Sequence, residues 1–192
     1  TNYKCVALEI CICDLLKSGQ KTFSIALGNY KTLEELTDDS VLQGSYNYGL
    51  NNYLTLLSGI NLTKDYQGVL LGAGLNTFLG GVSLRADTSS ATWQDKDYDG
   101  QKISLDYSYY MPAYKMNFYA NAQTQTRHYL TVSNLLAYKN YDYLSTHELN
   151  DLFLTADLRN QLNFSLSKSF DNPKIGAFSA GFLVSDYWNK KN

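Results

Sequence analysis

The residue types that most often carry chemistry are few and gathered in separate places in this sequence. All three cysteines, Cys5, Cys11 and Cys13, lie in the first 20 residues, whereas the two histidines are His128 and His147. An odd number of cysteines in one short stretch cannot form a self-contained disulfide framework. Cys11 and Cys13 make a C-x-C pair, but a metal site would need two further ligands at a suitable spacing. We therefore predict no metal site and expect a short apolar strand or helix in this segment.

The other motifs that could suggest catalysis or cofactor binding have simpler explanations. The carboxylates of Glu34, Glu35, Asp38 and Asp39 fall in a polar stretch that reads as a solvated loop. The Gly-Ala-Gly at 72–74 lies inside an expected strand and lacks the G-x-G-x-x-G frame of a dinucleotide site. Any sequence with Ser, His and Asp permits a triad, so their presence carries no information. We predict no catalytic residue, no cofactor and no enzyme activity.

The composition indicates an ordered protein with an unusual balance of side chains. Charged residues make up 18% and hydrophobic residues 44% of the 192 residues, with a net charge of -2, so no basic excess indicates nucleic acid. Tyrosine occurs 17 times and proline twice, which suits long strands and interfaces between apolar and wet phases. The sequence contains no run of about 18 apolar residues, so it predicts no transmembrane helix. No secretory signal is visible at Thr1 either, so an exported protein would have lost its leader by processing or truncation.

From residue 22 onward, apolar and polar residues alternate with the period of two that is typical of strands. Tight turns are expected at 51–52 and 64–65, and polar loops at 31–40 and 89–100. Residues 128–160 break the alternation, and we expect a long loop there with one short strand and a helical turn near 147–158. The pattern predicts nine strands, at 22–30, 42–50, 53–63, 66–77, 79–88, 103–109, 114–127, 160–170 and 175–187.

The expected strands and connections favour a membrane barrel over a soluble fold. Strands of about 9–13 residues are longer than the soluble mode of about 5–6 and are long enough to cross a bilayer at a tilt. Turns of two to four residues alternate with loops of ten or more, as they do in transmembrane barrels. A soluble sandwich also has alternating strands, because one face of each sheet is core. The polar faces here, however, are rich in Asn, Gln and Ser instead of Lys and Glu.

Several segments, in order, resemble the fimbrial usher family of outer-membrane proteins. Residues 22–30 resemble the strand with which the usher barrel resumes after its plug domain. Residues 43–89 are similar to the next usher strands, with Tyr48-Gly49-Leu50, Ser58-Gly59 and a closing Asp-Thr-Ser. Further similar segments are 99–109, 124–134 (where His128 stands in place of a more usual Tyr), 159–170 and 179–189, the last with Tyr187-Trp188-Asn189. The likeness covers roughly 21–190, and before that only residues 14–20 match.

The resemblance implies an antiparallel transmembrane β-barrel fragment, roughly nine meandering strands of a larger barrel. Residues 1–20 would be a Cys-rich lead-in and residues 21–192 a partial usher barrel domain. The family's function implies a pore in the outer membrane of a Gram-negative bacterium that translocates pilus subunits delivered by a periplasmic chaperone. Such a slice has open edges, so we expect it to aggregate or to be inactive when it is produced alone.

A wide pore needs a lining that hydrates without gripping its cargo, and a surface that faces outer-membrane lipid. The predicted pore-lining residues are Gln43, Ser45, Asn47, Lys115, Asn117, Asn121, Gln123, Arg127, Gln161 and Asn163. The predicted lipid-facing residues are Leu42, Tyr46, Leu54, Leu56, Val82, Leu84, Ile103, Leu105, Phe118, Leu162, Phe164 and Phe182.

Two other functions stay open at this point. A secreted β-sandwich could bind glycans by stacking Trp93 and Trp188 on sugar rings, and it would be soluble without detergent. An unrelated porin-like channel for small molecules would share the strand pattern but would lack chaperone-binding and plug domains.

Overall fold

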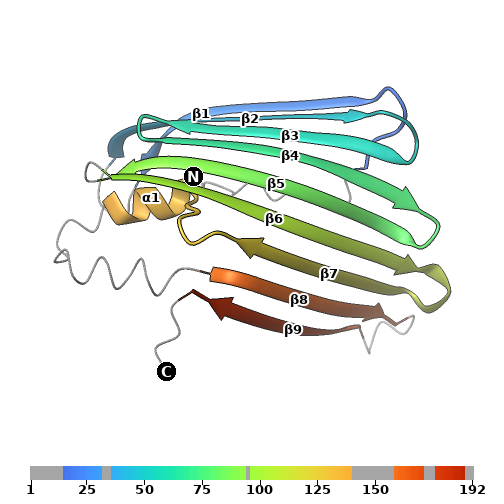
Figure 1. Cartoon of the computed structure of the whole chain (residues 1–192). Helices are drawn as coiled ribbons and strands as arrows, with labels where there is room; N and C mark the ends of the chain where they lie inside the picture. The colour runs from blue at the N-terminus through green and yellow to red at the C-terminus, as the bar shows by residue number, and fades with distance from the viewer. Residues whose placement is uncertain (1–14, 32–35, 94–95, 140–157, 171–175, 189–192) are drawn as a thin grey trace.

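The chain folds into a single antiparallel sheet of nine strands that follow one another in sequence order (Figure 1). The computed structural model describes residues 15–31, 36–93, 96–139, 158–170 and 176–188. Each strand pairs with the next along the chain, so the predicted meander of nine strands is confirmed. The elements are β1 (Lys21–Lys31), β2 (Leu36–Gly49), β3 (Leu54–Thr63), β4 (Tyr66–Thr77), β5 (Gly80–Trp93), β6 (Lys96–Met111), the 3-10 helix η2 (Pro112–Tyr114), β7 (Met116–Gln125), the helix α1 (Val132–Lys139), β8 (Leu158–Ser169) and β9 (Ala177–Tyr187).

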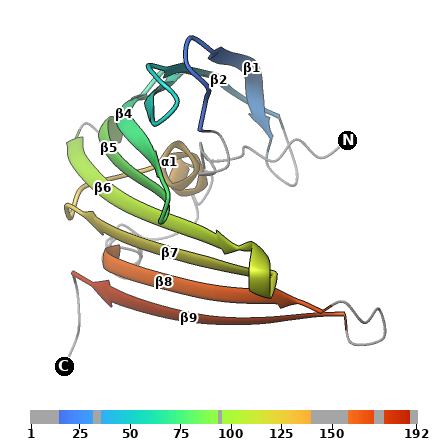
Figure 2. The same cartoon turned by 90° about the vertical axis from the view of Figure 1, so that its right-hand side faces the viewer.

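The sheet is strongly curved, and α1 lies on its concave side (Figure 2). Val132 and Leu135 of α1 pack with Tyr66 and Ala91, which therefore point to the concave side. Side chains alternate across a strand, and paired residues share a face. The register thus assigns every strand residue to the concave or the convex face, starting from these contacts.

Short connections join neighbouring strands at both ends of the sheet, with two residues between β3 and β4 and two between β4 and β5. Between β2 and β3, the Asn51 side-chain oxygen accepts hydrogen bonds from the backbone N–H groups of Tyr53 and Leu54, both at 2.8 Å. This is the turn chemistry that favours Asn at such positions. After η2, Lys115 adopts the left-handed conformation with φ 50° and turns the chain into β7.

Two predicted loops are largely strand, and those predictions were wrong. β2 begins at Leu36 and pairs back to Lys31, although residues 31–40 are mostly polar. β5 and β6 continue their ladder to the pair Trp93 and Lys96, across most of 89–100. Backbone pairing does not require apolar side chains when both faces of a strand end are wet, so polarity was a poor guide to the ends.

The irregular segment after β7 also differs from expectation. The described part contains α1 at Val132–Lys139, earlier than the helical turn expected near 147–158. Most of that expected turn, residues 147–157, lies outside the described residues, and so do Cys5, Cys11 and Cys13. In the described ranges, no helix is long and apolar enough to cross a membrane.

Candidate functional site

The concave face carries polar, mostly uncharged side chains that bond to one another across neighbouring strands. Gln123 donates to Gln161 at 2.7 Å, and Gln161 donates to Ser185 at 3.2 Å, which links β7, β8 and β9. On β1 and β2, the hydroxyls of Ser24 and Ser45 lie 2.7 Å apart. Such pairs satisfy part of the hydrogen-bonding capacity of the wall and leave the remainder for water. We call this surface the polar face.

The register places most of the predicted pore-lining residues on the polar face. Asn121 pairs with Asn163 and Gln123 with Gln161, so these four share one patch of β7 and β8. The two exceptions lie beyond strand ends: exposed Lys115 is the residue that follows η2, and exposed Arg127 follows the end of β7. The residues on the polar face are Gln43, Ser45, Asn47, Asn117, Asn121, Gln123, Gln161 and Asn163.

One carboxylate, Asp106 on β6, gathers four donors from the strands on either side. Arg85 donates to Oδ2 at 2.7 Å and Ser83 to the same oxygen at 3.2 Å, both from β5. From β7, Tyr119 donates to Oδ1 at 3.0 Å and Asn121 at 2.8 Å. The Asp106 side chain is only 3% exposed and that of Arg85 13%. We call these five residues the Asp106 node. It ties three strands together through a charge that is fully hydrogen-bonded.

A second ion pair lies beside the node on the same two strands. Lys102 Nζ is 3.7 Å from Asp87 Oδ2, and both side chains are less than a quarter exposed. The same ammonium lies 5.2 Å from the centre of the Tyr129 ring. Two positive and two negative charges of β5 and β6 therefore neutralise one another on the polar face.

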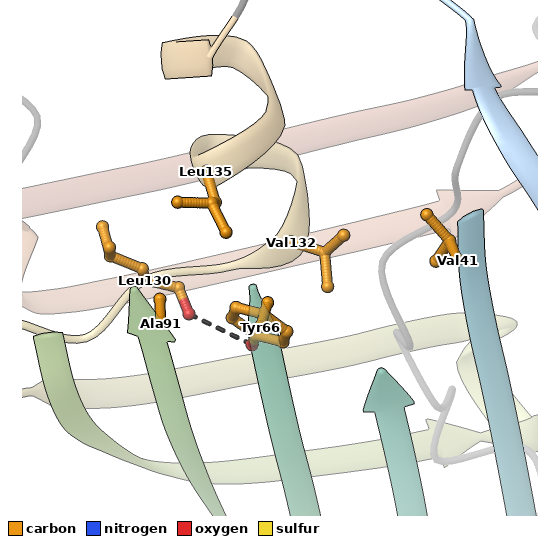
Figure 3. Packing of buried hydrophobic residues seen from close by; sticks show 6 residues of the cluster. All are labelled: Val41, Tyr66, Ala91, Leu130, Val132 and Leu135. Carbon is orange, nitrogen blue, oxygen red and sulfur yellow. Dashed lines mark hydrogen bonds between the residues drawn. The ribbon is translucent and has the colours of Figure 1, made fainter. Parts of the chain in front are cut away.

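A segment that leaves β7 crosses the concave side and covers the far ends of β4, β5 and β6. Figure 3 shows its apolar contacts, in which Leu130, Val132 and Leu135 meet Tyr66 and Ala91. The Tyr66 hydroxyl donates to the backbone oxygen of Leu130 at 3.2 Å (Figure 3). We call residues 126–135 the strap. It narrows the space enclosed by the curved sheet at this end.

Two contacts explain why the strap lies so close to the wall. The Leu130 N–H donates to the Ser89 hydroxyl at 3.2 Å. Gly100 faces the strap, and a side chain there would overlap the backbone of His128 and Tyr129, so only glycine permits this approach. Burial, with Asp87 nearby, raises the pKa of the Tyr129 phenol, which therefore stays neutral at ordinary pH.

The chain enters the sheet from the concave side at the opposite end. Before β1, the Leu16 N–H donates to the Thr55 hydroxyl at 2.9 Å, and both residues are buried. Two backbone hydrogen bonds join this segment to the end of β2. The Gly19 N–H donates to the Gly49 oxygen at 2.8 Å, and the Gly49 N–H donates to the Gln20 oxygen at 2.9 Å. We call residues 15–20 the lead-in.

The convex face is apolar and exposed, which is the opposite of a soluble sheet that buries its apolar side. Leu84 is 54% exposed, Leu71 62% and Phe182 61%. Phe118 stacks edge-on between Tyr107 and Phe164, with ring centres 5.5 and 4.8 Å apart. By register, every residue predicted to face lipid lies on this face.

Sequence reasoning missed the Asp106 node and the strap. The alternation does put Ser83 and Arg85 on the polar side of one strand and Asp106 on that of the next. What it lacks is the register, which alone shows that Ser83 stands opposite Asp106 and that Asp106 stands opposite Asn121. In the part of the chain that the structure describes, no group of three or more His, Cys, Asp or Glu could hold a metal ion.

Comparison with known proteins identifies a family and several relatives of this chain. The sequence model of the family described as outer membrane usher protein matches residues 9–192. The outer membrane usher protein HifC of Haemophilus influenzae is 28% identical over 186 residues, covering 92% of this chain and 21% of the relative. The outer membrane usher protein YehB of Escherichia coli K12 is 27% identical over 186 residues, with 92% and 22% covered. The chain thus spans about a fifth of the length of these relatives.

Solved structures show the same fold. An Escherichia coli P pilus tip assembly intermediate, PapC-PapD-PapK-PapG, contains a chain that matches with a TM-score of 0.68 and 21% identity, covering 92% of this chain and 21% of that one. The translocation pore of the P pilus usher PapC matches with a TM-score of 0.61 and 19% identity, covering 91% and 41%. The nine strands are therefore a slice of an usher-type β-barrel, as predicted. With a family match that extends over nearly its whole length, the chain belongs to the outer membrane usher family.

Proposed function

We propose that this chain forms part of the wall of an outer-membrane pore that translocates pilus subunits, delivered by a periplasmic chaperone, to the cell surface. The relatives are named outer membrane ushers, and one structural neighbour is the translocation pore of a P pilus usher. The proposal extends those words to this chain. The observation that carries it is the contrast between a hydrogen-bonded polar face on the concave side and an exposed apolar face on the convex side.

The convex face is suited to lipid. Burying an exposed apolar side chain in an apolar phase is favourable by about 25 cal/mol per Å². This face presents exposed large apolar side chains on every strand except β7, where Phe118 is half-buried. The strands have 10–16 residues, which is enough to cross the hydrocarbon layer at a tilt and continue into water. The partner on this side is outer-membrane lipid.

The concave face is suited to the passage of a folded protein. Amides and hydroxyls on this face bond to one another across neighbouring strands, as Gln123, Gln161 and Ser185 do, so part of their hydrogen-bonding capacity is already satisfied within the wall. In the ion pairs Arg85–Asp106 and Lys102–Asp87, each charge is neutralised by a partner on the same wall. A lining of this kind hydrates cargo without binding it, which a secretion pore for different subunits requires.

Photo-crosslinking in cells tests the proposal. A photoreactive amino acid is placed at Asn163 of a full-length usher carrying this chain, and the cells express the matching chaperone and subunits. Because Asn163 lies on the polar face, we expect crosslinks to pilus subunits during assembly. Leu162 is the matched control, since the neighbouring residue points to the opposite face and is 48% exposed there. We expect no subunit crosslinks from Leu162.

Two outcomes would contradict the proposal. Equal subunit crosslinking from positions 162 and 163 would mean that the barrel wall does not keep cargo on one face. A complete lack of subunit crosslinks from Asn163, Asn121 and Ser45 in cells that assemble pili would show that cargo does not pass this wall. A secreted glycan-binding sandwich would need a second sheet on the apolar face, but the nine described strands form one sheet.

A further inference from the structure

Four charged residues of the polar face on β5 and β6 are paired so that their charges are neutralised and mostly covered: Arg85 with Asp106, and Lys102 with Asp87. Arg85 is the clearest case, because an arginine on a pore wall would ordinarily extend its guanidinium into water. Here the side chain is 13% exposed and its terminal nitrogen lies 2.7 Å from Asp106. Asp106 itself is 3% exposed. The charge of Arg85 is thus both neutralised and covered.

The neighbouring strand β4 leaves the space in which the Arg85 side chain lies along the wall. Arg85 pairs with Gly72 of β4 across the sheet. A Cβ at Gly72 would stand 2.9 Å from Cγ of Arg85 and 2.8 Å from the backbone oxygen of Leu84. Real Cβ atoms do not approach that closely, so any side chain at position 72 would push the arginine stem away from the wall.

Asp106 provides the other end of the arrangement. It holds the guanidinium with one oxygen and is itself fixed from β7 by Tyr119 and Asn121, at 3.0 and 2.8 Å on its other oxygen. With donors on both oxygens, the carboxylate cannot turn away from Arg85 without losing several bonds at once. The position of the positive charge is therefore set by three strands and not by Arg85 alone.

We propose that Gly72, Arg85 and Asp106 form a unit that keeps the Arg85 charge paired in the wall and out of the lumen. By doing so, this unit sets the ion selectivity of the pore. The inference rests on the proposed function, since it takes the polar face to be the pore lining. At physiological salt the field of an exposed charge extends about 8 Å into solution, so a released guanidinium would act on ions that pass this part of the wall. The same field would act on charged cargo.

Ion selectivity measured in planar bilayers tests the unit. The full-length usher carrying this chain is compared with Asp106→Asn, Arg85→Gln and the double variant, under a potassium chloride gradient. Asp106→Asn leaves Arg85 without its counter-charge, so the reversal potential is expected to move toward that of chloride. Arg85→Gln leaves the carboxylate, so the shift is expected toward potassium. The double variant restores balance and is expected to return to the wild-type value.

Asp99→Asn is the matched control. It makes the same change of charge on β6, but Asp99 pairs with Ser90 and points to the convex side, so no shift is expected. If Asp106→Asn does not assemble, the sign of the Arg85→Gln shift decides the matter alone. Shifts of the same sign in both single variants, or no shift in Arg85→Gln, would overturn the proposal. Subunit crosslinking from Asn163 is independent of these charges, so it distinguishes failure of this inference from failure of the pore assignment.

Discussion

Removing the Asp106 carboxylate should be the most destabilising single change on the polar face. Asp106→Ala takes the acceptor from Arg85, Ser83, Tyr119 and Asn121 at once. It also leaves the Arg85 guanidinium, which is mostly covered, without a counter-charge. Buried donors and charges without partners are costly, because they have already been removed from water.

The magnitude follows from the burial of the pair. Breaking a buried ion pair by removing one partner costs about 3–5 kcal/mol. Arg85 keeps 13% exposure on a face that we assign to a water-filled lumen, so some rehydration is possible. We therefore expect the free energy of unfolding to fall by about 3 kcal/mol, the low end of that range. Ser83→Ala removes one bond of 3.2 Å to the same carboxylate and should cost about 1 kcal/mol.

Urea unfolding of the full-length usher in detergent micelles measures these costs. The folded fraction is followed by the compact band on unheated gels, and midpoints are compared among variants with equal m-values. Asp99→Ala serves as the control, because that exposed carboxylate should change stability by no more than about 0.5 kcal/mol.

The reasoning would be refuted if Asp106→Ala lay within about 1 kcal/mol of the Asp99→Ala control. Such a result would mean that water replaces the carboxylate without loss, and hence that the node is hydrated in solution. A cost for Ser83→Ala equal to that of Asp106→Ala would contradict the central place of the carboxylate among its donors.

Three further predictions concern the convex face, the strap and the lead-in. Leu84→Arg should lower the stability of the folded barrel in vesicles by about 2–4 kcal/mol, whereas the same substitution at Asn163 should have a much smaller effect; equal effects would contradict the assignment of faces. Gly100→Ala should push the strap from the wall and speed hydrogen exchange of the Leu130 amide, and unchanged exchange would contradict the close packing. Thr55→Val removes the hydroxyl that accepts a hydrogen bond from the Leu16 N–H, so hydrogen exchange of the Leu16 amide should be faster and the free energy of unfolding should fall by about 1 kcal/mol.

The sequence predicted the sheet well because alternation is a local property of each strand. Alternation within one strand is enough to assign the face of Phe23, Ile25 and Leu27, and no information on the neighbouring strand is needed. In the structure, all three side chains are more than 75% exposed on the convex side. The same local signal separated most of the pore-lining candidates from the lipid-facing residues. Lys115 and Arg127 lie beyond the ends of β7, because the alternation in the sequence continues past both ends of this strand into a turn and into the strap.

Strand ends and cross-strand partners could not be read in the same way. The segment around Asp97 and Asp99 is polar, and for that reason the sequence predicts a loop there. In the structure it belongs to a paired hairpin, in which the Thr92 hydroxyl donates to Asp97 at 2.9 Å. Register depends on turn geometry and on contacts far apart in sequence. For that reason the separation of 21 residues between Arg85 and Asp106 conceals the ion pair, although the alternation of each strand puts both residues on a polar side.

The β5–β6 hairpin connects the two features that sequence reasoning missed. It carries the node near the end where Gly81 pairs with Ser108, and it supports the strap nearer its other end through Ser89 and Gly100. Because β7 ends at Gln125 while β6 extends further, the chain can turn inward there and lie across the wall. The ladder between β5 and β6 is continuous from Gly81 to Trp93, without the register shifts seen between β1 and β2 or between β8 and β9. The node and the strap contact lie six residues apart along β6, at Asp106 and Gly100, and share no hydrogen-bond partner, so the effects of a change in each on stability should add when the two are combined.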